Sequence, residues 1–567
     1  MDVSTTSLLR ITRVKLAAMV AVGLSACPAS ARAPETLGVP GASLPSGAQG
    51  TPPSWAGQAY RQGVVSVANP YGAEAGAKIL EQGGNAIDAA VAAALTAAIV
   101  APHQTGIGGY GGHMTLFDAK SNKVTAIDFN SHAPAAATPD MFPLDAAGKV
   151  IGQKNMYGWL AAGVPGILAG LHLALTKYGT KSFREIAQPA IGLAREGFPA
   201  GAAAASIKAA ANHLAADPAS KALYFKDGQP LGATDHYANP HLATLLEWLA
   251  ADNSVDSFYR GRIARDIAEA FADNGGLVTL GDLAVYQARE VEPLKISWGD
   301  WTIYTAPLTA GGATVLHAML LMQELKWADR DPASADALQM QVETFRYAWQ
   351  DRLELFGDPQ GKASPLEKLL QPEAIRLAAG KIEKAVAAKQ PLPVRTTSRP
   401  DQGTINLSAA DRSGNLVAVT LTHGGSFGAR VTVPGFGLTL GHGMSRFDPH
   451  SSHPNAPGPH KRPLNNMCPT VVAKNGRPVI ALGARGGRKI PNAVAEVLLQ
   501  LAAREKSLAD AVAAPRMHTE GQLALNFEKA WPPAPLEEMK QRGYQVTTAA
   551  SATVSAVETG SFVSAMR

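Results

Sequence analysis

Cysteine, repeated motifs and blocks of like charge are scarce in this sequence. The 567 residues include only two cysteines, Cys27 and Cys468, which is too few for a disulfide-stabilised scaffold. The net charge of +5 is small for this length and no long lysine or arginine run is present, so nucleic acid is not expected as a partner. No motif recurs at a fixed period, which excludes a repeat architecture. Cys468 has apolar neighbours and is expected to be a small, buried hydrophobic side chain.

Long apolar runs are also missing. The run from Leu16 to Leu24 is too short to span a bilayer as a stable helix, so no transmembrane span is expected. Basic residues precede this run, which predicts a secretory signal peptide over residues 1–33 and hence an exported protein, periplasmic or secreted. The residues before Cys27 also resemble a bacterial lipoprotein box, so a lipid anchor at this cysteine is an alternative. Residues 34–58 are rich in Pro, Gly, Ala and Ser and are predicted to be a disordered leader.

The periodicity of apolar residues predicts an α+β protein. Residues 163–282 are expected to be largely helical, and strands are expected to dominate from 404 to about 482. A strand-rich centre between helical blocks favours sheets stacked between helix layers. The first ordered elements are predicted to be strands at 63–68, 113–118 and 124–129 and an alanine-rich helix at 85–100.

Two strands around one turn stand out in the second half of the chain. Residues 405–411 alternate apolar and polar side chains, the period of a half-buried strand, and residues 416–422 are expected to run back beside them. Gly403 and Thr404 stand immediately before this hairpin. Thr404 either simply opens the hairpin or has a chemical role at its head.

We predict that the chain cuts itself between Gly403 and Thr404. A threonine hydroxyl is a weak nucleophile that needs a base within hydrogen-bond reach. The α-amino group released by the cut has a pKa of about 8, so part of it is unprotonated near neutral pH. Thr404 would then carry nucleophile and base in one residue. Residues 360–403 are charged, with prolines near the end, and are predicted to be an exposed linker that tolerates cleavage.

Two motifs that suggest other functions are rejected. Residues 106–111 satisfy the glycine spacing of a dinucleotide site, but they follow a predicted helix and precede a predicted strand, the reverse of what that site requires. Close approach of two backbones is the better account of these glycines. Residues 442–460 contain four histidines and an aspartate, but their spacing matches no zinc motif. Neither a metal nor a cofactor is expected.

Several separated motifs occur in order from Gly63 to the C-terminal region. They are Gly83-Gly84-Asn85-Ala86-Ile87-Asp88-Ala89-Ala90, Gly106-Ile107-Gly108-Gly109, Gly163-Val164-Pro165-Gly166, Asp351-Arg352, Gly357-Asp358-Pro359, Lys461-Arg462-Pro463-Leu464 and Gly483-Ala484-Arg485-Gly486-Gly487. Their order and spacing resemble the γ-glutamyltranspeptidases, a family of N-terminal-nucleophile hydrolases. The resemblance implies a four-layer αββα sandwich, built jointly by two subunits of one self-cleaved precursor. Residues 59–403 would form the large subunit and residues 404–567 the small one.

The resemblance also implies roles for single residues. Thr404 aligns with the processed N-terminal threonine, and Thr422 with the threonine that orients this nucleophile. Gly486 and Gly487 align with the oxyanion hole, where backbone N–H groups can point together at a developing negative charge.

Three positions depart from the family pattern. The arginine that holds the substrate α-carboxylate is replaced by Asn130, and the serine pair that assists it is replaced by Asn465-Asn466. The acidic residue that holds the α-amino group is replaced by Arg446. A cation at that position repels an ammonium group and attracts a carboxylate. The implied catalytic groups are therefore retained, whereas the implied clamp for a free amino acid head is rewritten. Further cations, Arg430, Arg485, Arg488 and Lys489, are candidates for a positive rim.

The expected function is that of a γ-glutamyltransferase-like enzyme acting on a small amide or peptide. It would cleave γ-glutamyl, glutathione-like or related acidic acyl amides through an ester on Thr404 and pass the acyl group to water or an amine. Two alternatives are an acylase for an amide of another acid and a catalytically silent exported binding protein of the same fold. A weaker alternative is an enzyme that acts on a γ-linked polymer of the cell envelope.

Overall fold

The structure is a computed structural model that describes residues 59–567 apart from residue 61, residues 397–403 and residue 561. The predicted signal peptide, the predicted leader, Cys27 and Gly403 lie outside the described residues. Residue contacts divide the chain into units of residues 1–53 and 54–567, and the described fold belongs to the second unit.

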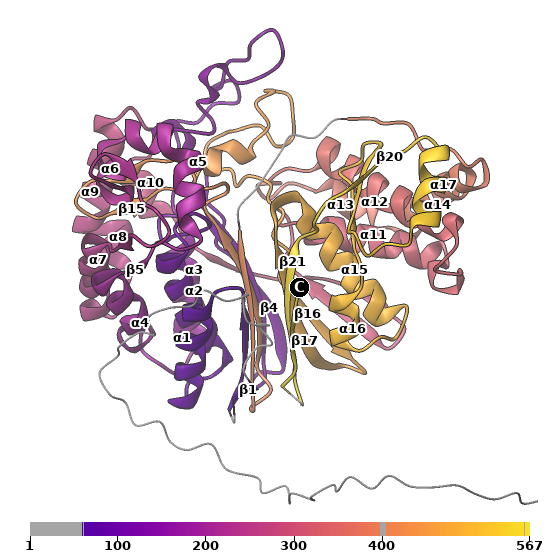
Figure 1. The fold of residues 1–567 in the computed structure, drawn as a ribbon, viewed down its shortest axis with the longest axis horizontal. Coiled ribbons are helices and arrows are strands. Elements are labelled where there is room, and N and C mark those ends of the chain that lie inside the picture. Colours follow the sequence, from indigo (N-terminus) through magenta and orange to yellow (C-terminus); the bar gives the residue numbers. More distant parts are fainter. Residues whose placement is uncertain (1–58, 61, 397–403, 561) are drawn as a thin grey trace, which may run out of the picture. The chain divides into compact units, whose positions relative to one another are not determined.

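The first large sheet brings together strands that are far apart in sequence. Within the described residues it has seven antiparallel strands in the order β1, β2, β12, β13, β3, β4, β9. Their bounds are Ala59–Tyr60, Gly63–Val67, Ile405–Asp411, Leu416–Thr422, Gly111–Asp118, Lys123–Asp128 and Arg289–Val291. The predicted hairpin is confirmed as β12 and β13, and it is inserted between β2 and β3 (Figure 1).

The second large sheet has six antiparallel strands within the described residues, in the order β10, β11, β16, β17, β21, β22. Their bounds are Leu294–Trp298, Trp301–Thr305, Thr470–Lys474, Arg477–Arg485, Thr553–Glu558 and Ser564–Met566. The shorter strands are β5 (Phe198–Pro199), β6 (Phe225–Lys226), β7 (Gln229–Pro230), β8 (His236–Tyr237), β14 (Thr432–Val433), β15 (Leu438–Thr439), β18 (Met517–His518), β19 (Ala524–Phe527) and β20 (Gln545–Thr548).

The two large sheets pack face to face. One buried cluster joins residues of both sheets, namely Val64, Phe117, Ala410, Leu416, Ala418, Val471, Ala481 and Val557. The hydroxyl of Ser408 also reaches across and donates to the backbone oxygen of Ser555 in β21 at 3.3 Å. Every residue of β12 is buried, so the prediction of a half-buried strand was wrong. The side chains of Asn406 and Ser408 contact Ser555 of the second sheet instead of water.

Helices cover the outer faces of both sheets (Figure 1). Over the first sheet lie α1 (Pro70–Glu81), α2 (Ala86–Val100), α3 (Ile167–Tyr178), α4 (Phe183–Glu196) and α7 (Pro240–Asp252), with α5 (Ala203–Ala216), α6 (Pro218–Tyr224), α8 (Asp256–Arg260), α9 (Arg262–Asp273) and α10 (Leu280–Val285) beyond them. The other side has α11 (Gly312–Glu324), α12 (Ala335–Leu355), α13 (Pro365–Leu369), α14 (Pro372–Ala387), α15 (Ile490–Ala502), α16 (Leu508–Ala513) and α17 (Pro533–Gln541). The predicted αββα layering is confirmed.

The alanine-rich helix predicted at 85–100 is α2, and it is buried along its whole length. Asn85 caps its start by accepting from the N–H groups of Ile87 and Asp88, each at 2.9 Å. Asp411 at the end of β12 accepts from the N–H of Ala86 at 2.8 Å, which ties the central hairpin to the helix. Because alanine side chains are small, α2 packs closely against α1, α4, β12 and β13. This close packing is typical of a protein interior.

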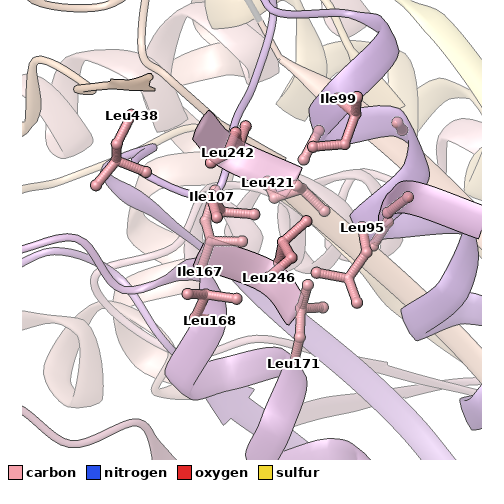
Figure 2. Packing of buried hydrophobic residues seen from close by; sticks show 14 of the residues in the cluster. Leu95, Ile99, Ile107, Ile167, Leu168, Leu171, Leu242, Leu246, Leu421 and Leu438 are labelled. Atoms are coloured by element: carbon pink, nitrogen blue, oxygen red, sulfur yellow. The ribbon is translucent and has the colours of Figure 1, made fainter. Parts of the chain in front are cut away.

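A continuous apolar core backs the end of β13. Figure 2 shows side chains of α2, α3 and α7 converging on Leu421, among them Leu95, Ile99, Ile167, Leu171, Leu242 and Leu246. All of these residues are buried. Thr422, the next residue after Leu421, is therefore held in place at the edge of a well-packed core.

Two sequence-based predictions of secondary structure were wrong. The predicted linker 360–403 contains the helices α13 and α14, because Ile375 and Ile382 give α14 an apolar face that packs into the second core. Between residues 423 and 469 the described chain is mostly loop, with only the two-residue strands β14 and β15. That region is rich in Gly, Pro, Ser and Asn, which favour turns over paired β-strands.

The glycines of residues 106–111 follow α2 and lead into β3, which begins at Gly111, as the sequence predicted. A Cβ atom at Gly108 would lie 2.5 Å from the carbonyl oxygen of Thr439, and one at Gly111 would lie 2.3 Å from that of Phe129. Close backbone approach accounts for these glycines. In the part of the chain that the structure describes, no helix is both long and apolar enough to cross a membrane.

Candidate active site

Thr404 and Thr422 stand opposite each other at one end of the central hairpin. The register pairs Ile405 with Leu421 and Asn406 with Thr420, so the next pair along the ladder is Thr404 with Thr422. Both side chains are buried, Thr404 with 6% and Thr422 with 1% of its surface exposed. Directly opposed residues of an antiparallel pair have Cβ atoms about 4.5–5.5 Å apart, so the two hydroxyl groups lie within reach of each other.

Both threonines lie on the face of the hairpin that meets the second sheet. Ile405, Leu407 and Leu421 belong to the core on the helix side. The alternate residue Asn406 has its side-chain amide 2.6 Å from the hydroxyl of Ser555 in the second sheet. Since Thr404 and Asn406 are two residues apart, their side chains share a face. Thr404 therefore points toward the place where β17 of the second sheet ends.

A small pocket of about 10 Å³ forms at this place. It is lined by Tyr110, Thr404, Thr422, Gly424, Arg446, Asn466, Met467, Gly487 and Ile490. This volume holds at most about one water molecule. A reacting carbonyl group fits here, but the body of a substrate does not.

Thr422 is oriented by the backbone of the loop that follows it. Its Oγ1 accepts a hydrogen bond from the N–H of Gly424 at 2.7 Å. Gly424 has a φ of 98°, a left-handed conformation that favours glycine, and a Cβ there would lie 2.3 Å from the His442 ring. With its lone pair engaged, the Thr422 hydroxyl is set to donate its own proton to a neighbouring oxygen.

Gly486 and Gly487 follow β17 and lead into α15. Their φ angles are 139° and 63°, both in the region that favours glycine. Gly487 lines the Thr404 pocket and opens a short 3₁₀ turn over Gly487–Lys489 directly before α15. Backbone N–H groups at the start of a helix are unpaired within it and carry partial positive charge. This geometry suits stabilisation of an oxyanion formed at Thr404.

An open cleft of about 750 Å³ adjoins the small pocket. Arg446 and Asn466 line both cavities, and the sequence neighbours Gly424 and Gly425 line one each, so the two are continuous. Clefts of roughly 300–1,000 Å³ hold small ligands or short peptides. Four arginines line this cleft, namely Arg352, Arg430, Arg446 and Arg488.

The acidic side chains of the cleft are paired within the protein. Glu354 accepts from Arg395 at 3.0 Å, and Asp448 accepts from the ring of His450 at 2.7 Å. The cleft therefore has an excess of positive charge.

Arg446 lies where the two cavities meet. Its guanidinium donates to the carbonyl oxygen of Gly424 at 2.5 Å and lies 3.2 Å from Nε2 of His442. His442 donates from Nδ1 to the carbonyl oxygen of Met156 at 3.0 Å, so its Nε2 accepts from Arg446. Arg446 is thereby held with its charge directed at the mouth of the Thr404 pocket.

Of the other predicted substrate-binding residues, one lines the cavities and two do not. Asn466 lines both cavities. Asn130 and Asn465 line neither, since both are buried in polar networks of their own. Asn130 donates to Thr309 at 2.8 Å and to the carbonyl oxygen of Pro463 at 2.7 Å. Asn465 contacts the ring of His113 at 2.9 Å.

Of the predicted positive rim, two members line the cleft and two do not. Arg430 and Arg488 line it, and Arg488 also pairs with Glu520 at 3.5 Å. Arg485 donates instead to Gln104 at 3.3 Å, and Lys489 donates to the backbone oxygen of Ala550 at 2.5 Å.

Three histidines near the site, His442, His423 and His103, have lowered pKa values and are uncharged at neutral pH. Burial and, to a smaller extent, the neighbouring Arg446 lower the pKa of His442 to about 3. Burial and His103 lower the pKa of His423 to about 3, and burial and Arg485 lower that of His103 to about 4. None of them can act as a general base with a pKa near 7. Within the described ranges, no three His, Cys, Asp or Glu side chains form a group suited to a metal ion.

A buried ion pair holds the segment that frames the site. Arg462 donates to Asp128 at 2.9 Å and to the carbonyl oxygen of Asn130 at 3.1 Å. Burial alone would raise the pKa of Asp128, but Arg462, His113 and Arg289 outweigh it and hold that pKa well below its usual range. The backbone N–H of Arg462 also donates to Asp358 at 2.7 Å. These contacts fix the start of the chain that carries Asn465 and Asn466.

Sequence reasoning did not identify the roles of Gly424 and Arg352. Gly424 lies two residues after the end of β13, and its glycine pair with Gly425 is the only local signal. Arg352 was noted as part of a motif, but its contact was not predictable. It donates to the carbonyl oxygen of Asn465 at 2.5 Å and to the side chain of Asn466 at 3.3 Å.

Two facing sheets between helix layers, with a threonine at the head of a central strand, define the fold class of the N-terminal-nucleophile hydrolases. The same fold is found in the crystal structure of cephalosporin acylase from Bacillus halodurans, with a TM-score of 0.79 and 24% sequence identity. That match covers 92% of this chain and 96% of the acylase chain.

Residues 72–563 match the family described as Gamma-glutamyltranspeptidase, and the chain belongs to this family. It is 35% identical over 502 residues to the glutathione hydrolase proenzyme of Escherichia coli (strain K12), covering 86% of each chain. It is also 32% identical over 493 residues to the acylase ACY 1 proenzyme of Pseudomonas sp. (strain SE83), covering 86% of this chain and 87% of the acylase.

Proposed function

We propose that this chain is a γ-glutamyltransferase-like amidohydrolase, processed by its own cleavage at Gly403–Thr404. It cleaves γ-glutamyl or related acidic acyl amides through an ester on Thr404. The observation that carries the proposal is the pocket that Thr404 shares with Thr422 and Gly487. The family membership, with glutathione hydrolase and acylase proenzymes among the relatives, supports the reaction class.

The first step in this proposal is processing. The hydroxyl oxygen of Thr404 attacks the carbonyl carbon of Gly403, the C–N bond breaks, and the chain is left as an ester with a free amino group on Thr404. Water then hydrolyses this ester, which releases the Gly403 carboxylate and restores the hydroxyl. The new amino group is the base that the side chain needs.

Turnover repeats the same chemistry on a substrate. The amino group of Thr404 takes the hydroxyl proton while the oxygen attacks the amide carbonyl. The N–H of Gly487 stabilises the oxyanion, and Thr422 keeps the nucleophile in position. The C–N bond breaks, the amine leaves with the transferred proton, and water or a second amine takes the acyl group from the ester.

The substrate preference follows from Arg446. A guanidinium at the mouth of the pocket favours a donor that carries a carboxylate there and disfavours a free α-ammonium group. This charge supports an acylase for acidic amides as the second candidate. Both candidates use the same nucleophile and differ only in the head group that the cleft accepts.

The test is the processing itself. Purified protein is expected to separate on a denaturing gel into two fragments, and the smaller one is expected to begin Thr-Ile-Asn-Leu. Thr404→Ala should stay intact and inactive, whereas Thr404→Ser, which keeps a hydroxyl, should still be cut. An intact chain that turns over amides, or a small fragment that begins at another residue, would contradict the mechanism.

A second measurement separates an enzyme from a silent binding protein. After exposure to a panel of acidic acyl amides, mass spectrometry of the small fragment should show an acyl adduct. A binding protein would be processed but would form no adduct with any donor.

Export is part of the proposal. The basic and apolar residues within 1–33 support a secreted or periplasmic location, with a lipid anchor at Cys27 as the alternative. Fractionation of producing cells, followed by mass analysis of the mature large subunit, tests both points.

A further inference from the structure

Arg430 lies in the outer cleft and belongs to a stack of three side chains. Its guanidinium carbon is 4.2 Å from the centroid of the Tyr157 ring, and the ring centroids of Tyr157 and His213 are 4.1 Å apart. The guanidinium also donates to Nδ1 of His213 at 3.0 Å. Because this nitrogen accepts a hydrogen bond, His213 is neutral, and burial and Arg430 both lower its pKa. The stack therefore carries one full positive charge.

The protein does not neutralise this charge within the described residues. Arg430 has no carboxylate partner there, and burial is the largest influence on its pKa, which is lowered. The two carboxylates that line the same cleft, Glu354 and Asp448, are paired with Arg395 and His450. An arginine has five N–H donors, and His213 engages only one of the five nitrogen-bound protons of Arg430. A half-buried cation with unused donors is a ready partner for an anion.

The backbone fixes Arg430 relative to the cleft. Arg430 has a φ of 60°, and its N–H donates to the carbonyl oxygen of Phe427 at 2.9 Å. The neighbouring carbonyl of Ala429 accepts from the N–H of Gly158 at 2.9 Å, which holds the Tyr157 loop against this turn. A side chain held in this way loses little entropy when it binds a ligand.

We infer that Arg430, Tyr157 and His213 form a second anion subsite, which binds a carboxylate that the substrate carries in addition to the one near Arg446. This inference rests on the proposed function, since it concerns the same cleft. Arg446 lines both cavities whereas Arg430 lines only the outer one, so the two cations bind different parts of one molecule. The substrate class is an amide with two carboxylates. The second carboxylate is carried either by the acyl group or by the amine.

Three donors distinguish these sources. The first has one carboxylate on the acyl group and a neutral arylamine. The second has the same acyl group on an amino acid, and the third has an acyl group with two carboxylates on the neutral arylamine. Arg430→Gln is expected to raise KM about tenfold for the donor whose second carboxylate binds here, the effect of losing one charge-assisted hydrogen bond. KM for the first donor should stay within about twofold of wild type, since that donor has no group for the subsite.

The matched control is Arg477→Gln, which removes an exposed arginine that lines neither cavity. It should leave KM unchanged for all three donors. Equal KM increases for the first donor and for both dicarboxylate donors in Arg430→Gln would overturn the subsite, because they would indicate a general change of shape. Unchanged KM values for every donor would overturn it as well.

A binding measurement keeps the subsite separate from the reaction. Calorimetric titration of processed wild type uses uncleavable ketone analogues of the second and third donors. One of these dicarboxylate analogues is expected to bind wild type about tenfold more tightly than Arg430→Gln. If that difference is present but no donor is turned over, the subsite stands and the proposed function fails. If donors are turned over but wild type and Arg430→Gln bind both dicarboxylate analogues equally, the subsite fails and the proposed function stands.

Discussion

The N–H of Gly424 donates a hydrogen bond of 2.7 Å to the hydroxyl oxygen of Thr422. This contact occupies a lone pair of Thr422 and turns its proton toward other oxygens, of which the opposed Thr404 is the nearest by register. Replacing Thr422 by Val keeps the shape but removes the hydroxyl. We expect kcat to fall by roughly 10–100-fold, with slower processing, because one positioning hydrogen bond is lost.

Thr422→Ser is the matched control, since it restores the hydroxyl and should recover most of the rate. Gel-based processing rates and steady-state kinetics measure both variants. A Thr422→Val protein with normal kcat would show that the nucleophile is oriented by another group.

Gly487→Ala places a side chain at a φ of 63° beside the proposed oxyanion position. The left-handed conformation costs a non-glycine residue about 1–2 kcal/mol, and its relief rotates the N–H away from the pocket. We expect kcat to fall by about 10²–10³-fold, the usual effect of losing one oxyanion donor. Gly476→Ala has a comparable φ of 75° in open space at the β16–β17 turn and should lose stability without losing kcat.

Arg446→Asp reverses the charge at the mouth of the pocket. Donors with a free α-ammonium group should gain about tenfold in kcat/KM, and donors that present a carboxylate there should lose about as much. Arg446→Gln removes the charge without reversing it, so it should show the loss but not the gain. If Arg446→Asp lowers kcat/KM equally for both donor types, the residue supports the fold and not the choice of substrate.

The pH dependence of kcat/KM should report the amino group of Thr404. That group is active when unprotonated, so kcat/KM should rise about tenfold per pH unit on the acid side and level off near pH 8. The pKa values of His442 and His423 are about 3, so neither ring titrates between pH 5 and 9. His442→Gln should therefore leave the position of this limb unchanged, and a shift of a full pH unit would assign the limb to histidine.

Asp128→Asn leaves the buried Arg462 without its counter-ion. Removing one partner of a buried pair costs about 3–5 kcal/mol, and denaturant unfolding measures this loss. The control is Arg289→Gln, which removes the other cation of Asp128 from a side chain that is 51% exposed, and its effect should be at most about 1 kcal/mol.

The sign of the pH dependence adds a check on this pair. The pKa of Asp128 is lowered in the folded protein, so its stabilising contribution is present above the unfolded pKa of about 4 and is lost as the pH falls below it. The difference in stability between wild type and Asp128→Asn should accordingly shrink in acid. A difference that is constant down to pH 2 would exclude the ion pair as its origin.

The local pattern around residues 404–422 was sufficient to predict the hairpin, because alternation, turn residues and a leading threonine are all encoded in adjacent positions. Burial was not predictable from that pattern. Asn406 and Ser408 look solvent-facing in sequence, and only the docking of β21 converts them to interior residues. The helix over 372–387 was missed because its charged outer face dominated the composition, although Ile375 and Ile382 are spaced for one buried stripe.

The site likewise contains residues that the sequence predicted and contacts that it did not. Thr404, Thr422 and Gly487 could be aligned by motif, and the structure brings them to one pocket. The stack of Tyr157, His213 and Arg430 joins three segments with no shared motif, so sequence spacing carries no sign of it. Contacts of this kind depend on loop paths that only the tertiary structure determines.

The strand order of the first sheet has a consequence for the life of the protein after cleavage. β12 and β13 would belong to one product, while β2 and β3 on either side would belong to the other, and all are joined by hydrogen-bonded ladders. The two polypeptides would be interleaved and could not dissociate as folded units. Dilution should then leave them together, and denaturation should be the only route by which they part.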